Sequence, residues 1–171
     1  MTFSKRKENS QSRMDIVECA EKKLSRKSMA VKELRDYLQK REYEKEEIDR
    51  VVSAMLDYGY LNDARFTCEF LIYDLGRGRS LKKAFYDLRA KGVQETDIEA
   101  GYNEYLDEFG EPDEHETAMR EAEKVLTAAD IGPGCEIPEK IQGRIARRLF
   151  TRGFSQSMIY EILSELRNRQ A

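Results

Sequence analysis

The apolar residues of the chain follow one spacing that occurs three times. Within each set, steps of four residues trace one face of a helix, and a step of five crosses a polar bend between two helices. The sets need no insertion or deletion to match one another, which predicts three copies of a helix pair. They are Leu34, Leu38, Tyr43, Ile48 and Val52; Ala84, Leu88, Val93, Ile98 and Tyr102; and Ile145, Leu149, Phe154, Ile159 and Leu163.

A further amphipathic stretch precedes each pair, at residues 14–25, 63–75 and 114–129. The chain is therefore predicted to be all-α, with three tandem three-helix repeats that form an elongated, curved body. Most tyrosines and phenylalanines fall on the apolar stripes and are expected in the core. The predicted parts are a disordered lead-in at 1–13, repeats at 14–61, 62–110 and 111–171, and a linker at 130–137 inside the last repeat.

The bends carry the residues that helix ends require. Gly92 and Gly153 stand where a helix ends in a left-handed residue, each followed by an apolar residue. Glu42 occupies this position in the first repeat, so we expect that turn to differ in detail. The predicted starts of the following helices are a capping box from Thr96 to Glu99, an N-cap at Ser155 and a first helical residue at Pro138.

Composition narrows the class of protein. Charged residues make up 37 % of the chain and the mean hydropathy is −0.75, which suits solvent-facing helices. No stretch is long and apolar enough to span a membrane, and residues 1–13 lack the apolar core of a secretory signal. Three widely spaced cysteines argue against disulfides and zinc, so buried thiols and a cytoplasmic location are expected: Cys19, Cys68 and Cys135.

Charge is segregated along the chain although the net charge is only −3. Residues 77–91 and 140–152 are strongly basic, whereas residues 95–130 are strongly acidic. Like-sign blocks steer oppositely charged partners. Because the pI is about 5.5, non-specific duplex binding is disfavoured, and a protein partner fits better, whether or not it carries nucleic acid.

Residues for catalysis are not gathered in any motif. His115 lies alone between acids and is expected at the surface, and the carboxylates are expected on exposed helix faces. The segment from Gly76 to Ser80 lacks the Gly-Lys-Ser/Thr ending of a phosphate loop. Its glycines are therefore expected to separate two helices, and Ser80 to cap the second of them. We expect no enzyme, no cofactor and no metal site.

The segment from Leu56 to Phe66 resembles the hallmark stretch of the RecX family of recombinase regulators: a helix ending in Gly, an aromatic-Leu pair, a polar-Asp cap and then an aromatic residue. The run from Gly78 to Val93 is similar to the middle helix and following turn of the second repeat in that family, and the turn at Gly153 is similar to that of the third repeat. The resemblance covers about residues 16–166. Departures from the family pattern are Glu42-Tyr43, the lack of Arg near Ala30, and Thr67 in place of a small Ala.

The family motif has a structural interpretation. We expect Gly59 to end a helix, Tyr60 and Leu61 to pack across the joint between repeats, and Asn62 or Asp63 to cap the next helix. The residues assigned to this structural motif are Gly59, Tyr60, Leu61, Asp63, Phe66, Gly92 and Gly153.

The resemblance implies binding in the groove of the RecA recombinase filament on single-stranded DNA, with inhibition of filament growth, ATP hydrolysis and strand exchange in DNA repair, recombination and the SOS response. A repeating rod can make several weak contacts with such a repeating groove. A monomer with no membrane contact and at most weak direct DNA contact is expected. The candidate contact residues are Arg77, Arg79, Lys82, Lys83, Arg89, Arg144, Arg147, Arg148 and Arg152.

Two other functions stay open at this point. The basic helices could contact DNA directly as a helical nucleic-acid-binding module. Alternatively, the repeats could form a solenoid-type adaptor for an unrelated protein.

Overall fold

The computed structural model describes residues 14–169; the predicted disordered lead-in at 1–13 lies outside this range. The described residues form nine α-helices and no strand. Repeat 1 comprises α1 (Ile16–Leu24), α2 (Val31–Gln39) and α3 (Lys45–Asp57). Repeat 2 comprises α4 (Asp63–Gly76), α5 (Leu81–Ala90) and α6 (Glu95–Phe109), and repeat 3 comprises α7 (Glu114–Thr127), α8 (Glu139–Thr151) and α9 (Gln156–Asn168).

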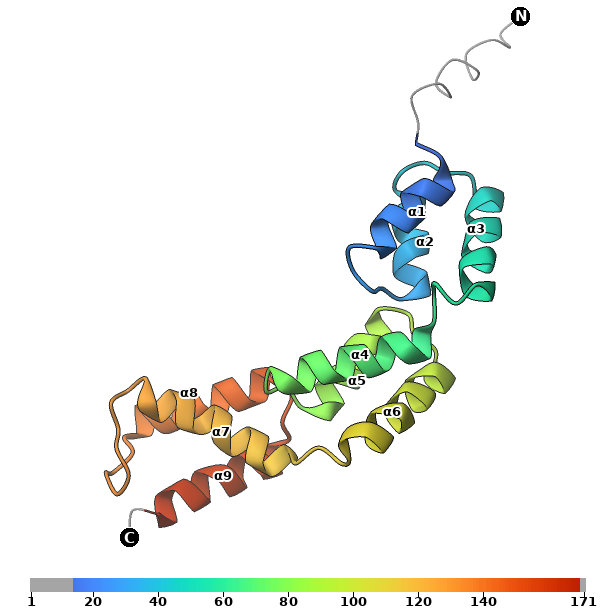
Figure 1. Ribbon diagram of the computed structural model, residues 1–171. Coiled ribbons are helices and arrows are strands. Elements are labelled where there is room, and N and C mark those ends of the chain that lie inside the picture. The colour runs from blue at the N-terminus through green and yellow to red at the C-terminus, as the bar shows by residue number, and fades with distance from the viewer. Residues whose placement is uncertain (1–13, 170–171) are drawn as a thin grey trace, which may run out of the picture.

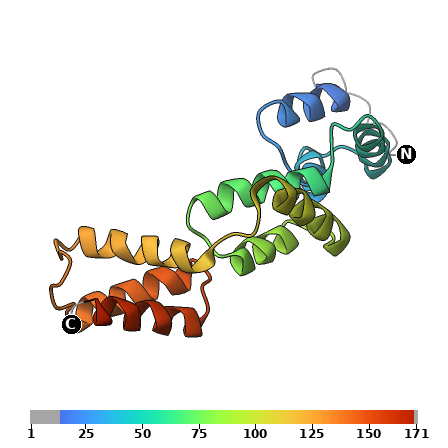
Figure 2. The same cartoon turned by 60° about the horizontal axis from the view of Figure 1, so that its bottom comes forward.

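The three repeats follow one another along an elongated, curved body, as the sequence predicts. Repeat 1 lies at one end and repeat 3 at the other, with repeat 2 between them (Figure 1). A second view shows the same succession, so the extended shape does not depend on the viewing direction (Figure 2). The all-α prediction with three tandem three-helix repeats is confirmed.

Each repeat has its own hydrophobic core. The core of repeat 1 is built around Leu34, Leu38 and Val52, and that of repeat 3 around Ile145, Leu149 and Ile162. The core of repeat 2 also takes in the methyl group of Ala30 from repeat 1. The predicted apolar sets therefore do lie inside, in three separate cores.

The three turns between the second and third helices of the repeats have the same backbone. Glu42 has φ of 63°, in the left-handed region that Gly92 and Gly153 occupy at 84° and 91°. In each turn the amide of the following apolar residue donates to a carbonyl five residues earlier, as from Tyr43 to Leu38 at 3.4 Å. The expectation that the Glu42 turn differs is therefore wrong: a glutamate accepts the left-handed conformation at some cost in strain.

Helix starts agree with the sequence at some positions and not at others. The hydroxyls of Ser80 and Ser155 accept the amides of Lys83 and Met158, so both predicted caps are present. The predicted capping box from Thr96 is wrong, because α6 begins earlier with Gln94 as its N-cap. Pro138 is the N-cap of α8 rather than its first residue.

The family motif around Gly59 agrees with the prediction only in part. Gly59 follows the end of α3 with φ of 73°, and the Asn62 side chain accepts the amide of Arg65 at the start of α4. Leu61 packs into the core of repeat 1 and does not cross the joint. Tyr60 is 63 % exposed, so its predicted packing across the joint is wrong.

Several other burial expectations also need correction. Cys19 and Cys68 are buried as expected, but Cys135 is exposed in the loop between α7 and α8. Among the carboxylates expected at the surface, those of Asp74 and Glu121 are buried. The largest group of misplaced residues is aromatic and exposed: Tyr58, Tyr60, Tyr73, Tyr86, Phe109, Phe150 and Tyr160.

Candidate binding surface at the joint of repeats 2 and 3

The two predicted basic clusters meet where repeat 2 contacts repeat 3. The amide of Ser80 donates to the carbonyl of Arg152 at 3.0 Å. The Arg152 guanidinium in turn donates to the carbonyls of Arg77 at 2.5 Å and Gly78 at 3.3 Å. The loop that precedes α5 therefore lies against the C-terminal end of α8, and the end of α8 meets the end of α4 in Figure 1. The sequence suggests a stripe recurring on successive repeats, whereas the fold brings the clusters together.

A buried carboxylate from the acidic part of the chain lies at this joint. The side chain of Glu121 on α7 has no exposed surface and pairs with Lys124 at 2.5 Å, Arg148 at 2.7 Å and Arg152 at 2.9 Å. Gly78 lies so close that a Cβ there would collide with this carboxylate. Desolvation opposes ionisation of Glu121, but hydrogen bonds from Lys124 and Arg148 and the charges of both arginines outweigh it and lower its pKa.

Other predicted contact residues are also engaged within the chain. Arg79 pairs with Asp74 at 3.3 Å and with Asp87 at 3.1 Å, and Lys83 shares Asp87. Burial raises the pKa of the Asp74 carboxyl against the pull of the Arg79 charge. Arg89 pairs with Glu95 at 2.5 Å on the surface. Arg148 and Arg152 bind Glu121, so all five of these cations neutralise carboxylates of the same chain.

The remaining predicted cations are exposed. Within residues 14–169, Lys82, Arg144 and Arg147 form no ion pair. Arg77 lies over the exposed ring of Tyr73, 5.2 Å from its centroid, and forms no ion pair in the described part of the chain either. We call these four side chains the free basic set.

Exposed rings share the helix faces of the free basic set. Tyr86 is 65 % exposed and stands one turn after Lys82 on α5. Phe150 is 64 % exposed and follows Arg147 at the same kind of spacing on α8. Cations next to exposed aromatic rings provide contacts that a protein partner or a nucleotide base can use.

One kind of hydrogen bond recurs at both joints, and the sequence prediction did not include it. At the first joint, Asp63 of α4 accepts the amide of Val31, the first residue of α2, at 2.9 Å. At the second joint, Glu114 of α7 accepts the amide of Leu81, the first residue of α5, at 2.7 Å. The sequence signal is weak, since it consists only of an acid at the first residue of α4 and of α7. Of the two residues expected to cap α4, Asn62 does so, whereas Asp63 caps a helix of the previous repeat.

The glycines of the turns serve these joints as well. A Cβ on Gly92 would collide with the side chain of Lys32, and a Cβ on Gly153 would collide with Lys83 and Ser80. The turn of each later repeat is thus seated on the start of the middle helix before it.

The described residues show little that resembles an active site. His115 lies 3.0 Å from Glu165, and both side chains are about 40 % exposed. Within residues 14–169 no group of three or more His, Cys, Asp or Glu side chains could hold a metal ion. None of the helices described is long and apolar enough to cross a lipid bilayer.

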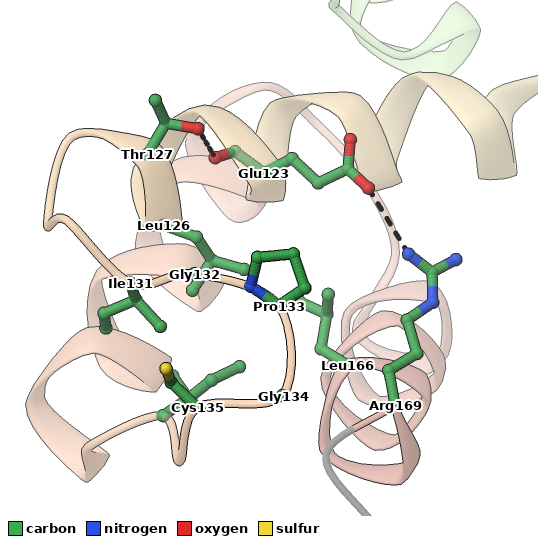
Figure 3. A pocket seen from close by; sticks show the side chains of 11 residues that line it. Glu123, Leu126, Thr127, Ile131, Gly132, Pro133, Gly134, Cys135, Leu166 and Arg169 are labelled. Carbon is green, nitrogen blue, oxygen red and sulfur yellow. Dashed lines mark hydrogen bonds and ion pairs between the residues drawn. The ribbon is translucent and has the colours of Figure 1, made fainter.

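A cavity of about 300 Å³ lies at the far end of repeat 3, beneath the loop between α7 and α8 (Figure 3). Its walls are mainly the apolar side chains of Leu126, Ile131 and Leu166. Glu123 and Arg169, 3.3 Å apart, form an ion pair at its edge. This cavity holds no paired nucleophile and base, and it lies away from the joint that carries the free basic set.

Comparison with known proteins points to one family. The family model described as "RecX, first three-helix domain" matches residues 18–53. A protein of Clostridium perfringens (strain 13) named Regulatory protein RecX is 30 % identical over 139 residues, which cover 81 % of this chain and 62 % of the relative. The protein of the same name from Bacillus subtilis (strain 168) is 28 % identical over 144 residues, which cover 84 % and 52 %. These matches support assignment of the chain to the RecX family.

Solved RecX structures share the fold. The crystal structure of RecX from Lactobacillus salivarius matches with a TM-score of 0.66 at 22 % identity, covering 88 % of this chain and 94 % of that one. A second RecX crystal structure matches with a TM-score of 0.67 at 17 % identity, covering 87 % and 71 %. The chain spans about half the length of the Bacillus relatives it matches. Its RecX relatives are named regulatory proteins.

Proposed function

We propose that this RecX-family chain binds the RecA recombinase filament on single-stranded DNA and inhibits filament growth, ATP hydrolysis and strand exchange during DNA repair and the SOS response. The observation that carries the proposal is similarity to regulatory RecX proteins over most of the chain. It acts by binding, without catalysis, as a monomer in the cytoplasm.

The free basic set gives this proposal its contact residues. Lys82, Arg144 and Arg147 are exposed and form no ion pair in the described residues, so contact with an acidic surface does not first require breaking one. Arg148 and Arg152 are different, because their charges already neutralise the buried Glu121. We therefore restrict the partner-facing charge to the free basic set.

The test is recombinase ATPase activity on single-stranded DNA, measured against increasing amounts of the protein. The wild type should inhibit, and Lys82→Glu/Arg144→Glu/Arg147→Glu should inhibit about tenfold less well, because like charges now face the partner. Lys27→Glu/Lys40→Glu/Lys45→Glu is the matched control, since it makes the same change in net charge at exposed positions of repeat 1. A flat wild-type response would refute filament regulation.

Direct DNA binding is the second candidate function, because exposed Tyr73 and Tyr86 lie under the cations of Arg77 and Lys83. Fluorescence anisotropy with bare single-stranded DNA, across salt concentrations, distinguishes the two functions. Tight binding that weakens steeply with salt and does not need recombinase would favour the DNA-binding module. Equal inhibition by both triple variants would leave regulation standing but remove Lys82, Arg144 and Arg147 as its contact residues.

A further inference from the structure

The joint between repeats 1 and 2 and the joint between repeats 2 and 3 share two kinds of contact. At each of them, a carboxylate from the later repeat binds the first amide of a middle helix, and a turn glycine packs on the start of that helix. Asp63 and Gly92 do so at the first joint, and Glu114 and Gly153 do so at the second. Any difference in stiffness between the joints must therefore come from the contacts that they do not share.

The second joint has several additional contacts. The backbones of Ser80 and Arg152 are hydrogen-bonded directly, and the Arg152 guanidinium holds two carbonyls of the loop before α5. The same guanidinium binds Glu121, whose buried carboxylate lies directly beneath Gly78. One side chain, Arg152, thus connects the interior of repeat 3 to the backbone of repeat 2.

The first joint has a different set of contacts and a cavity of its own. A cavity of about 650 Å³ lies between repeats 1 and 2, with Lys32 and Arg35 on one side and Asp97 on the other. Besides the Asp63 contact, repeats 1 and 2 are joined by a hydrogen bond from the Arg65 guanidinium to the carbonyl of Gly59 at 3.0 Å. An ion pair between Lys91 and Glu33, 2.6 Å apart and partly exposed, also joins them. A pair so close to water contributes little stability. Ala30 crosses this joint with only a methyl group.

The carboxylates of Asp63 and Glu121, one at each joint, also differ in how well the protein stabilises their ionised form. Burial raises the pKa of Asp63, and the nearby charges of Asp97 and Glu33 raise it further, against the hydrogen bond from Val31. Glu121 lies among three cations, which stabilise its charged form. The first joint therefore contains a carboxylate that is poorly compensated, and the second contains one that is well compensated.

We propose that Glu121 and Arg152 lock repeats 2 and 3 into one rigid body, and that repeat 1 pivots on this body at the first joint. The lock holds Lys82 of repeat 2 at a fixed spacing from Arg144 and Arg147 of repeat 3. The pivot lets repeat 1 adjust its angle to a partner surface. Glu121 and Arg152 are positioning residues and need not touch a partner.

Distance distributions between paired spin labels test this proposal in the full chain. With Cys135→Ser as background, Ser53→Cys with Asn103→Cys spans the first joint, and Asn103→Cys with Ser164→Cys spans the second; the three labelled positions are exposed on helices. The distribution across the second joint should be narrow, and that across the first should be broader. Equal widths in the otherwise wild-type chain would overturn the proposal.

Glu121→Gln then tests the lock itself. It should broaden the distribution across the second joint and leave the first unchanged, because glutamine keeps the shape but not the charge. Glu123→Gln, on the same helix in an exposed ion pair, should change neither distribution. Should circular dichroism show that Glu121→Gln has lost helix, Arg152→Lys replaces it, since lysine keeps the charge but cannot bridge carboxylate and carbonyls together. An unchanged second joint in the folded variant would overturn the lock.

Discussion

Glu121 shows how much one residue depends on its surroundings. It belongs to a run of acids that mostly face solvent, yet it is fully buried and binds three cations. A buried charge is tolerated only when it is paired, and here the partners come from α7 and from the C-terminal end of α8. Two of the arginines expected to contact a partner serve this carboxylate instead.

Glu121→Gln should lower the free energy of unfolding at neutral pH by about 1–2 kcal/mol, since the half-buried arginines lose their counter-charge. The pKa of Glu121 is lower in the folded protein than in the unfolded chain. Its contribution is therefore complete above the ordinary glutamate pKa of about 4.3 and is lost as the pH falls through the lowered value. Urea unfolding at several pH values measures this. If the difference in free energy of unfolding between Glu121→Gln and wild type does not shrink in acid, this account of Glu121 is contradicted. Glu123→Gln should have a free energy of unfolding near that of wild type at every pH.

The contribution of Asp63 to stability should change with pH in the opposite direction to that of Glu121, because burial raises the pKa of Asp63 in the folded protein. The stability associated with its protonation is present below the ordinary aspartate pKa of about 3.9 and is lost as the pH rises through the raised value. At neutral pH, Asp63→Asn should stay within about 0.5 kcal/mol of wild type, since the amide oxygen can still accept the Val31 amide. Asp63→Ala should lose about 1 kcal/mol. Chemical unfolding compares the two variants, and equal losses would contradict this account.

At the scale of elements, repeat 2 depends on a close approach between α4 and α6. Gly101 of α6 lies against the backbone of Ala64 and the side chain of Thr67, both on α4. The absence of a side chain at Gly101 lets the two helices touch at this point. Thr67 is fully buried at this contact.

Gly101→Ala should destabilise the protein by about 1–3 kcal/mol, because the added methyl group forces α4 and α6 apart. Gly143→Ala is the matched control. Gly143 is also helical, but a Cβ there meets nothing within 4 Å. That variant should gain about 0.5–1 kcal/mol from helix propensity. Thermal unfolding followed by circular dichroism separates the two, and losses of similar size in both would argue against the close approach.

The turn at Glu42 allows a second comparison between elements. Its left-handed backbone costs a non-glycine residue about 1 kcal/mol, whereas the equivalent positions in the other repeats are glycines. Glu42→Gly should therefore stabilise repeat 1 by about 0.5 kcal/mol after the entropy cost of glycine. A higher urea midpoint for the loss of helix is expected; a lower one would show that the Glu42 side chain contributes more than the strain costs.

At the scale of the whole molecule, stability is divided among three cores. Since the repeats bury their apolar side chains separately, each is expected to open with a free energy of its own. Native-state hydrogen exchange should show this as three sets of protected amides. Glu121→Gln should reduce protection in repeat 3 and in the loop before α5, and leave α1 to α3 unchanged. A uniform loss over all nine described helices would contradict it.

The sequence by itself determined the helices and their grouping. The spacing of apolar residues, the glycines after the middle helices and the serine caps are local features, and local physics sets helix length and turn geometry. This is why even the Glu42 turn keeps the predicted position. The resemblance to the RecX family was likewise readable from the short segment around Gly59.

Only the tertiary structure decided which charges are available to a partner. The pairing of Glu121 with Arg148, like that of Asp63 with the start of α2, joins residues far apart in the sequence. Such pairs depend on how the repeats are set against one another, and helical spacing contains no information about that. The nine predicted contact residues divide into five that pair within the chain and the free basic set of four, because a cation's availability depends on which carboxylates the fold places beside it.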